Sequence, residues 1–135
     1  MISLKVIFGL FVVILTSHIL AVINNWYWVY KWIDVPMHFL GGIWLGLIFL
    51  CFIMPQLKIT DHKLLITMIL VASFAVLIGV FWEFSEFLSD IFLAHKSYFE
   101  ISQQGVADTM ADLFFDLVGG LAVFMSYSWK KFRKE

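Results

Sequence analysis

Long apolar runs, separated by short polar or aromatic connections, dominate this 135-residue chain. A helix needs roughly 20 apolar residues to cross the hydrocarbon core of a bilayer. Four segments reach that length, and they predict membrane-spanning helices near residues 4–24, 36–55, 63–88 and 106–129. The expected fold is an all-α membrane protein, a four-transmembrane-helix bundle built as a single transmembrane domain over residues 1–135.

The connections contain residues typical of helix ends and membrane interfaces. Residues 24–36, NNWYWVYKWIDVP, are rich in Trp and Tyr, which concentrate at the interface. Pro55 favours a turn after the second run because proline cannot continue a helix. Residues 90–105 are too mixed to span, and we expect them to lie along the interface.

The first run has one feature of a signal peptide, because Lys5 precedes its apolar core. However, the run is longer than a typical signal core, and no small-x-small cleavage site follows it. We therefore expect a retained helix.

Composition supports the membrane interpretation. Hydrophobic residues make up 62% of the chain and charged residues only 14%, against about 25% charged in soluble domains. Membrane lipids are the expected partners. A net charge of -1, with basic residues clustered only at the C-terminus, excludes nucleic acid as an expected partner. The single cysteine, Cys51, lies in an apolar run and is assigned a packing role.

Basic residues are distributed unevenly across the predicted bundle. Seven of the nine fall on the side of both termini: Lys5, Lys58, Lys63, Lys130, Lys131, Arg133 and Lys134. Only Lys31 and Lys96 fall opposite. The positive-inside rule therefore places both termini in the cytoplasm.

Acidic residues show the opposite distribution. Eight of the ten lie on or toward the outer side: Asp34, Glu83, Glu86, Asp90, Glu100, Asp108, Asp112 and Asp116. Residues four apart share a helix face, which joins Asp108, Asp112 and Asp116 in one stripe and sets Asp34 beside His38. Glu83 and Glu86 share a face of the third helix. Three helices are thus expected to bring ionisable groups to one level.

Each of these residues also has a simpler interpretation. Asp108 fits a helix cap or first-turn acid, Asp34 a solvated loop residue, and His18 an interhelical hydrogen-bonding histidine. Asp112 and Asp116 lie deeper, where each acid costs about 2.5–3.5 kcal/mol to insert. These two aspartates are therefore expected to have partners.

Three explanations account for such an acidic cluster. Carboxylates and imidazoles on facing helices form divalent-metal sites, and here the expected ligands are His38, Glu83, Glu86 and Asp112. Asp108 and Asp116 are then the candidates for catalytic proton transfer. The two alternatives are a proton-sharing acid network and a structural hydrogen-bonded cluster that joins helices. The expected cofactor is a divalent metal ion.

Two segments share a pattern. DVPMHFLGG, residues 34–42, and DLFFDLVGG, residues 112–120, both read Asp, three residues, His or Asp, two apolar residues, Gly-Gly. The pattern is consistent with a pseudo-two-fold repeat of helix hairpins. Such a repeat sets His38 opposite Asp116, and lets the second and fourth helices approach at four glycines: Gly41, Gly42, Gly119 and Gly120.

The segments DVPMHF, WEFSE and QQGVADTMADLFFDLVGG together resemble the YjdF-like family of small bacterial inner-membrane proteins, over about residues 34–120. The resemblance implies a bacterial inner-membrane location and adds weight to the site: Asp34, His38, Glu83, Glu86, Asp108, Asp112 and Gly119 fit its pattern. The chain is similar, more distantly, to VanZ-like membrane proteins, whose pattern Asp116 fits better. The segment after Gly105 departs from the YjdF-like pattern because it is shorter and lacks an expected Asp.

Three functions are compatible with the sequence. The first is a metal-dependent hydrolase or transferase acting on a lipid-linked substrate. The second is a proton or cation carrier, since intramembrane acids and histidines mark such pathways; four helices are few for a pore, so this function requires a homodimer. The third is a structural accessory protein with a hydrogen-bonded acid cluster.

Overall fold

The computed structural model describes residues 3–57, 64–92 and 105–133, and within these ranges the chain is helical and contains no strand. The elements are α1 (Leu4–Ile23), α2 (Trp26–Val29), a 3₁₀ turn (Lys31–Ile33), α3 (Asp34–Ile48), a π-helical turn (Phe49–Ile53), α4 (Leu64–Phe92) and α5 (Val106–Phe132). Four spans are long and apolar enough to cross a membrane: Leu4–Ile23, Lys31–Ile53, Leu64–Phe92 and Val106–Lys130. The expected all-α, four-helix class is confirmed.

The helix bounds differ from expectation at two places. The second span begins at Lys31, because the 3₁₀ turn Lys31–Ile33 runs directly into α3. Pro36 falls in the first turn of α3, where its missing backbone N–H does not interrupt the helix. The third helix continues to Phe92 instead of residue 88. Most of the segment expected at the interface, residues 93–104, lies outside the described residues.

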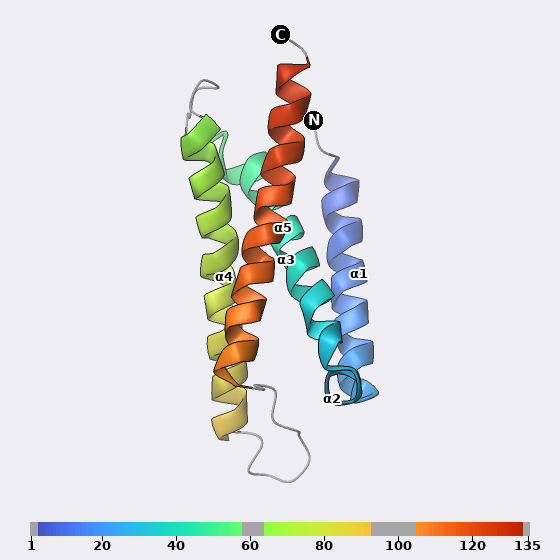
Figure 1. Cartoon of the computed structure of the whole chain (residues 1–135). Helices are drawn as coiled ribbons and strands as arrows, with labels where there is room; N and C mark the ends of the chain where they lie inside the picture. The colour runs from blue at the N-terminus through green and yellow to red at the C-terminus, as the bar shows by residue number, and fades with distance from the viewer. Residues whose placement is uncertain (1–2, 58–63, 93–104, 134–135) are drawn as a thin grey trace.

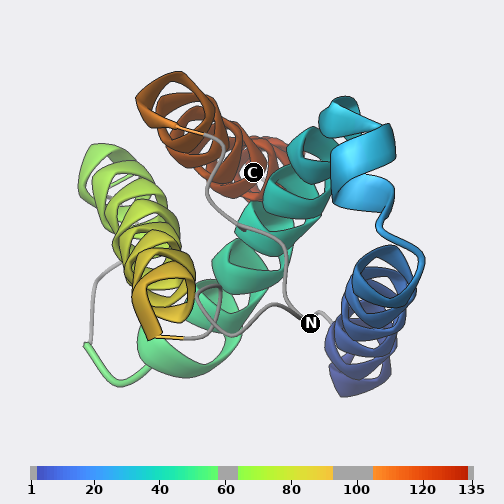
Figure 2. The same ribbon diagram turned by 90° about the horizontal axis from the view of Figure 1, so that it is seen from below.

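α3 occupies the middle of the bundle and packs against α1, α4 and α5. Viewed along the bundle, α1 lies on one side of α3, and α4 and α5 lie on the other sides (Figure 2). α1 begins and α5 ends at the same end of the bundle, and α2 lies at the opposite end (Figure 1). We call these the terminal end and the α2 end; the cytoplasmic location of the terminal end stays a prediction.

Glycines bring α3 and α5 into close contact. A Cβ atom on Gly42 would collide with the backbone carbonyl oxygen of Asp116, and one on Gly119 with that of Phe39. Small residues permit this approach between membrane helices. Gly120 instead faces α4, where an added Cβ would lie 3.1 Å from Cβ of Ala75.

The half of the bundle toward the terminal end holds an apolar core. Its buried members come from the π-helical turn, α4 and α5: Phe49, Leu50, Val71, Val123 and Phe124. Aromatic and branched side chains fill this region. The buried carboxyl groups and the buried histidine lie in the other half, toward the α2 end.

Candidate metal centre

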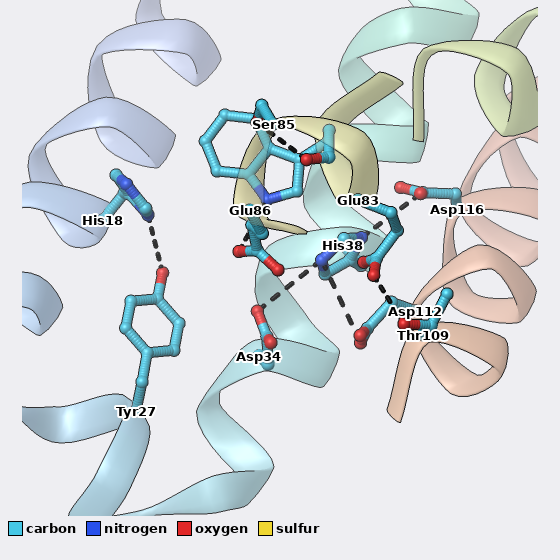
Figure 3. Close-up of polar contacts among 11 residues, drawn as sticks. His18, Tyr27, Asp34, His38, Glu83, Ser85, Glu86, Thr109, Asp112 and Asp116 are labelled. Carbon is cyan, nitrogen blue, oxygen red and sulfur yellow. Dashed lines mark hydrogen bonds and ion pairs between the residues drawn. The ribbon is translucent and has the colours of Figure 1, made fainter. Parts of the chain in front are cut away.

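His38 lies at the centre of a cluster of three aspartates (Figure 3). Its Nδ1 lies 3.2 Å from Oδ2 of Asp116, within hydrogen-bonding distance. Its Nε2 lies 3.6 Å from Oδ1 of Asp34 and 4.0 Å from Oδ1 of Asp112. α3 supplies Asp34 and His38 one turn apart, and α5 supplies Asp112 and Asp116 in the same way, so the i, i+4 spacing on two facing helices builds the cluster.

The cluster is shielded from its surroundings. Asp34 and His38 are 8% and 7% exposed, and Asp112 and Asp116 are 2% and 3% exposed. Buried polar atoms need partners, since an unpaired one keeps its full desolvation cost. Oδ1 of Asp112, the oxygen nearest His38, has no hydrogen-bond partner among the described residues. That oxygen is an unused acceptor inside the protein.

The hydrogen bond between Nδ1 of His38 and Asp116 determines whether Nε2 carries a hydrogen or a lone pair. An ionised Asp116 only accepts hydrogen bonds, so the network assigns the shared hydrogen to Nδ1 of His38. In a neutral ring Nε2 then carries a lone pair, and it faces Oδ1 of Asp34 and Oδ1 of Asp112. Nε2 of His38 and the two carboxylate oxygens are thus three acceptors that face one another. A cation between them, either a metal ion or a second proton on His38, would stabilise this arrangement.

The spacing of these acceptors fits a metal ion. Asp34, His38 and Asp112 each offer one ligand atom, and the three atoms lie within 4.8 Å of one another. Ligands of divalent ions lie about 2.0–2.6 Å from the ion, and thus at most roughly 5 Å from each other. Two carboxylates and one imidazole suit Zn²⁺, Mn²⁺ or iron. Asp116 also provides the outer carboxylate that commonly orients a metal-binding histidine.

Glu83 and Glu86, expected as ligands, lie outside this group. Glu83 is buried on α4 and accepts a hydrogen bond of 2.7 Å from Oγ1 of Thr109, while its Oε1 has no partner among the described residues. Glu86 accepts a hydrogen bond from Nε1 of Trp82 at 3.1 Å. Asp34, expected at the mouth of the second helix or in a loop, belongs to the group that could hold a metal ion.

The remaining candidates flank the cluster. Asp108 lies in the first turn of α5 and is partly exposed, as expected for an acid that favours the helix dipole. Nδ1 of His18, on α1, makes a hydrogen bond of 2.8 Å with the Tyr27 hydroxyl. Burial, with the nearby carboxyl groups of Asp34 and Glu86, raises the pKa of the Tyr27 phenol, which therefore stays protonated at neutral pH.

Glycines make room for Asp116. A Cβ atom on Gly79 would collide with its Oδ2, and one on Gly41 would lie 3.8 Å from its Oδ1. Gly42, described above, fits against its backbone. Asp116 is thus surrounded by three glycines from α3 and α4, two of which, Gly41 and Gly79, face its carboxyl group. The missing side chains explain how a carboxyl group fits at a helix crossing.

A comparison with protein families now places the chain. The model of the family described as "Predicted membrane protein (DUF2238)" matches residues 3–132. The chain belongs to this family. No curated protein and no solved structure matches it. Together with the four spans, family membership makes the chain an integral membrane protein; the likeness to VanZ-like proteins finds no support in the family match.

Sequence analysis missed three residues that shape the site. Gly79 gives space to Asp116, and glycine in a membrane helix carries no signal of such a contact. Trp82 donates to Glu86, whereas its position in the sequence indicates only an aromatic at the membrane interface. Thr109 lies in the segment QQGVADTMADLFFDLVGG, which resembles the YjdF-like family, so the sequence indicated that this position matters. Its contact with Glu83 across two helices was not visible in the sequence.

Proposed function

We propose that this protein binds a divalent metal ion through Asp34, His38 and Asp112, and that it acts as a metal-dependent hydrolase or transferase on a lipid-linked substrate. The unpartnered Oδ1 of Asp112, set opposite Nε2 of His38, carries this proposal. We also infer that the DUF2238 family is the YjdF-like family that the motifs resemble. A bacterial inner-membrane location follows from that inference.

A bound ion would supply Lewis-acid chemistry: it polarises a phosphoryl or carbonyl oxygen and activates a water molecule. The protein's own residues have separate tasks. Asp34, His38 and Asp112 would hold the ion. Asp116 fixes the ring of His38 through Nδ1 and is placed to take up a proton. The apolar surroundings exclude bulk water from the cluster.

The distribution of polar groups favours this function over a carrier. In the described residues, the polar cluster gives way toward the terminal end to the apolar core of Phe49, Leu50, Val71, Val123 and Phe124. A transport route for a cation needs polar groups along its length. A polar site that ends at a packed apolar core suits binding and catalysis.

Metal analysis of the purified protein tests the proposal. We expect wild type to retain about one equivalent of a divalent metal in detergent, and Asp112→Asn and His38→Ala to lose most of it because each removes one of only three ligands. Glu86→Gln is the matched comparison, since it alters an acid of the same region that lies outside the group.

The outcome separates the competing site models. Retention of metal by Asp112→Asn together with loss by Glu86→Gln would support the glutamate ligand set instead. Folded wild type that binds no added Zn²⁺, Mn²⁺ or Fe²⁺ would contradict metal binding and favour a protonated His38 in an acid network. Turnover of lipid extracts by the metal-loaded protein then tests the catalytic part of the proposal.

A further inference from the structure

A cavity of about 220 Å³ lies beside the metal centre, bounded by α1, α3 and α4. Its walls in the middle of the bundle are apolar and include Phe11, Ile14, Trp44 and Ile78. At the α2 end the lining becomes polar and includes His18, Tyr27, Asp34, His38 and Asp116. One cavity therefore joins a hydrocarbon-like compartment to the candidate metal centre.

The cavity lies where α1, which packs mainly on α3 and α2, leaves space beside α4. The ring of Phe11 stacks on Trp44 at 5.2 Å between centroids, and Nε1 of Trp44 donates to the carbonyl of Ile7 at 3.0 Å, which fixes α1 against α3. Toward the α2 end, His18 meets Trp82 of α4 edge to face at 5.2 Å. These contacts hold α1 in place while leaving space between α1 and α4.

The cavity reaches the surface that faces the bilayer. Leu15 on α1 and Trp82 on α4 line it, yet each side chain is 43% exposed. Both helices are membrane-spanning. An apolar space open to lipid does not stay empty, because a void forfeits the dispersion contacts that a hydrocarbon chain would make with its walls. Lipid is the component of the bilayer that supplies such chains.

We propose that this cavity binds one hydrocarbon chain of a membrane lipid and presents its oxygen-bearing head group to the metal centre. Cavities for whole drug-sized ligands measure about 300–1,000 Å³, so 220 Å³ accommodates part of a single chain. The polar end fits a head group with oxygen atoms: the His18–Tyr27 pair offers hydrogen bonds, and a metal ion at Asp34, His38 and Asp112 offers open positions. The head-group part rests on the proposed function; the chain part does not.

The charge at the polar end of the cavity determines under which conditions a phosphate or a hydroxyl head group can bind. Carboxyl groups crowd the polar end, and none of the described residues that line the cavity is Lys or Arg. A phosphate head group would be repelled by the aspartates unless the metal ion neutralises them, so phosphate-headed lipids require the loaded site. A hydroxyl head group can enter with or without metal. This difference separates the two sources of an oxygen-bearing head group.

Photolabelling in nanodiscs tests the inference. The probes are a long-chain alkyl phosphate and the matching alkyl alcohol, each with a diazirine in mid-chain, and labelled peptides are identified by mass spectrometry. We expect labelling of residues that line the cavity on α1, α3 and α4. Ile14→Trp and Ile78→Trp fill the cavity and should each reduce that labelling several-fold, while Ile19→Trp, at an exposed position of α1, should not.

Metal content measured on the same samples keeps the two proposals apart. Loss of label with metal retained in Ile14→Trp or Ile78→Trp supports the chain site and leaves the metal centre intact. Labelling of the cavity in wild type that binds no metal would contradict the proposed function and the binding of phosphate head groups. It would still support the site for the hydrocarbon chain. Label spread evenly over exposed faces of α1 and α4, and insensitive to both substitutions and to excess unlabelled lipid, would overturn the inference.

Discussion

The two nitrogens of His38 have different neighbours, and this asymmetry defines the site. Nδ1 has a hydrogen-bonding carboxylate in Asp116, whereas Nε2 faces two carboxylate oxygens at 3.6 and 4.0 Å. Metal-binding histidines commonly donate from the nitrogen that does not bind the ion, which fixes the ring and its tautomer. Under the proposed function Asp116 would be a positioning residue, and its contribution should be measurable apart from that of the ligands.

Replacing Asp116 by Asn should weaken metal binding without abolishing it. The amide keeps the size of the side chain but is a poorer acceptor, and loss of such outer contacts costs about 10–100-fold in metal affinity. Competition with a chelator of known affinity measures the change. Asp90→Asn, a conservative change of an acid near the end of α4 and outside the cluster, should leave the affinity unaltered. Equal affinities in wild type and Asp116→Asn would show that the ring of His38 is held by other contacts.

Thr109 should stabilise the fold through Glu83. Its hydroxyl donates to a carboxyl group that is only 6% exposed. Thr109→Val removes this donor at nearly constant volume, and leaving a buried acceptor unpaired costs about 1–3 kcal/mol. Thermal or denaturant unfolding in detergent measures the loss. Thr109→Ser retains the hydroxyl and should recover most of the stability; a serine variant as unstable as the valine variant would argue that the methyl group, not the hydroxyl, matters.

At the scale of helices, the contact between α3 and α5 sets the depth and alignment of the cluster. Gly42 and Gly119 allow the two backbones to approach until carbonyl oxygens of one helix face the glycines of the other. This brings the Asp34–His38 turn of α3 against the Asp112–Asp116 turn of α5. A repeat that relates residues 34–42 to residues 112–120 would also set His38 opposite Asp116. The repeat itself stays a prediction.

Gly42→Ala should therefore disrupt both packing and metal binding. The new Cβ would overlap the backbone of Asp116, which has no flexible end that can move aside. Overpacking of this kind costs about 1–3 kcal/mol, and the helices must separate where the ligands meet. Gly9→Ala provides the control, because nothing lies within 4 Å of its added Cβ. Unchanged stability in Gly42→Ala would show that the two helices are less tightly packed than described.

At the scale of the whole molecule, the bundle divides into an apolar half and a half with a buried polar cluster. α1 begins and α5 ends next to the apolar half, and α2 with its aromatic neighbours lies next to the polar half (Figure 1). The positive-inside rule predicts that the half with the cluster lies away from the cytoplasm. The substrate would then approach from the outer leaflet.

Cysteine accessibility tests this orientation. In a Cys51→Ala background, Val29→Cys reports on the α2 end and Arg133→Cys on the terminal end; both native residues are exposed. A membrane-impermeant maleimide added to intact bacterial spheroplasts should label Val29→Cys and should label Arg133→Cys only after lysis. The reverse pattern would place the cluster toward the cytoplasm and assign the substrate to the inner leaflet.

The sequence by itself determined the class of the fold and the helices that carry the site. Apolar runs of sufficient length and the i, i+4 spacing of Asp112 with Asp116 and of Asp34 with His38 depend only on helix geometry and on the cost of burying charge. The fourth helix was placed accurately, whereas the starts and ends near Lys31 and Phe92 were not, since helix ends depend on local contacts.

Only the tertiary structure decided which acids meet His38. Glu83 and Glu86 share a helix face as the aspartates do, although they are three residues apart and not four, yet α4 directs them to Thr109 and Trp82. Asp34 and Asp112 lie beside Nε2 of His38 instead and complete the group that could hold a metal ion. That choice depends on the rotation of each helix about its axis, which the packing at Gly42, Gly79 and Gly119 fixes. The cavity between α1 and α4 has the same origin, because it reflects where helices do not touch.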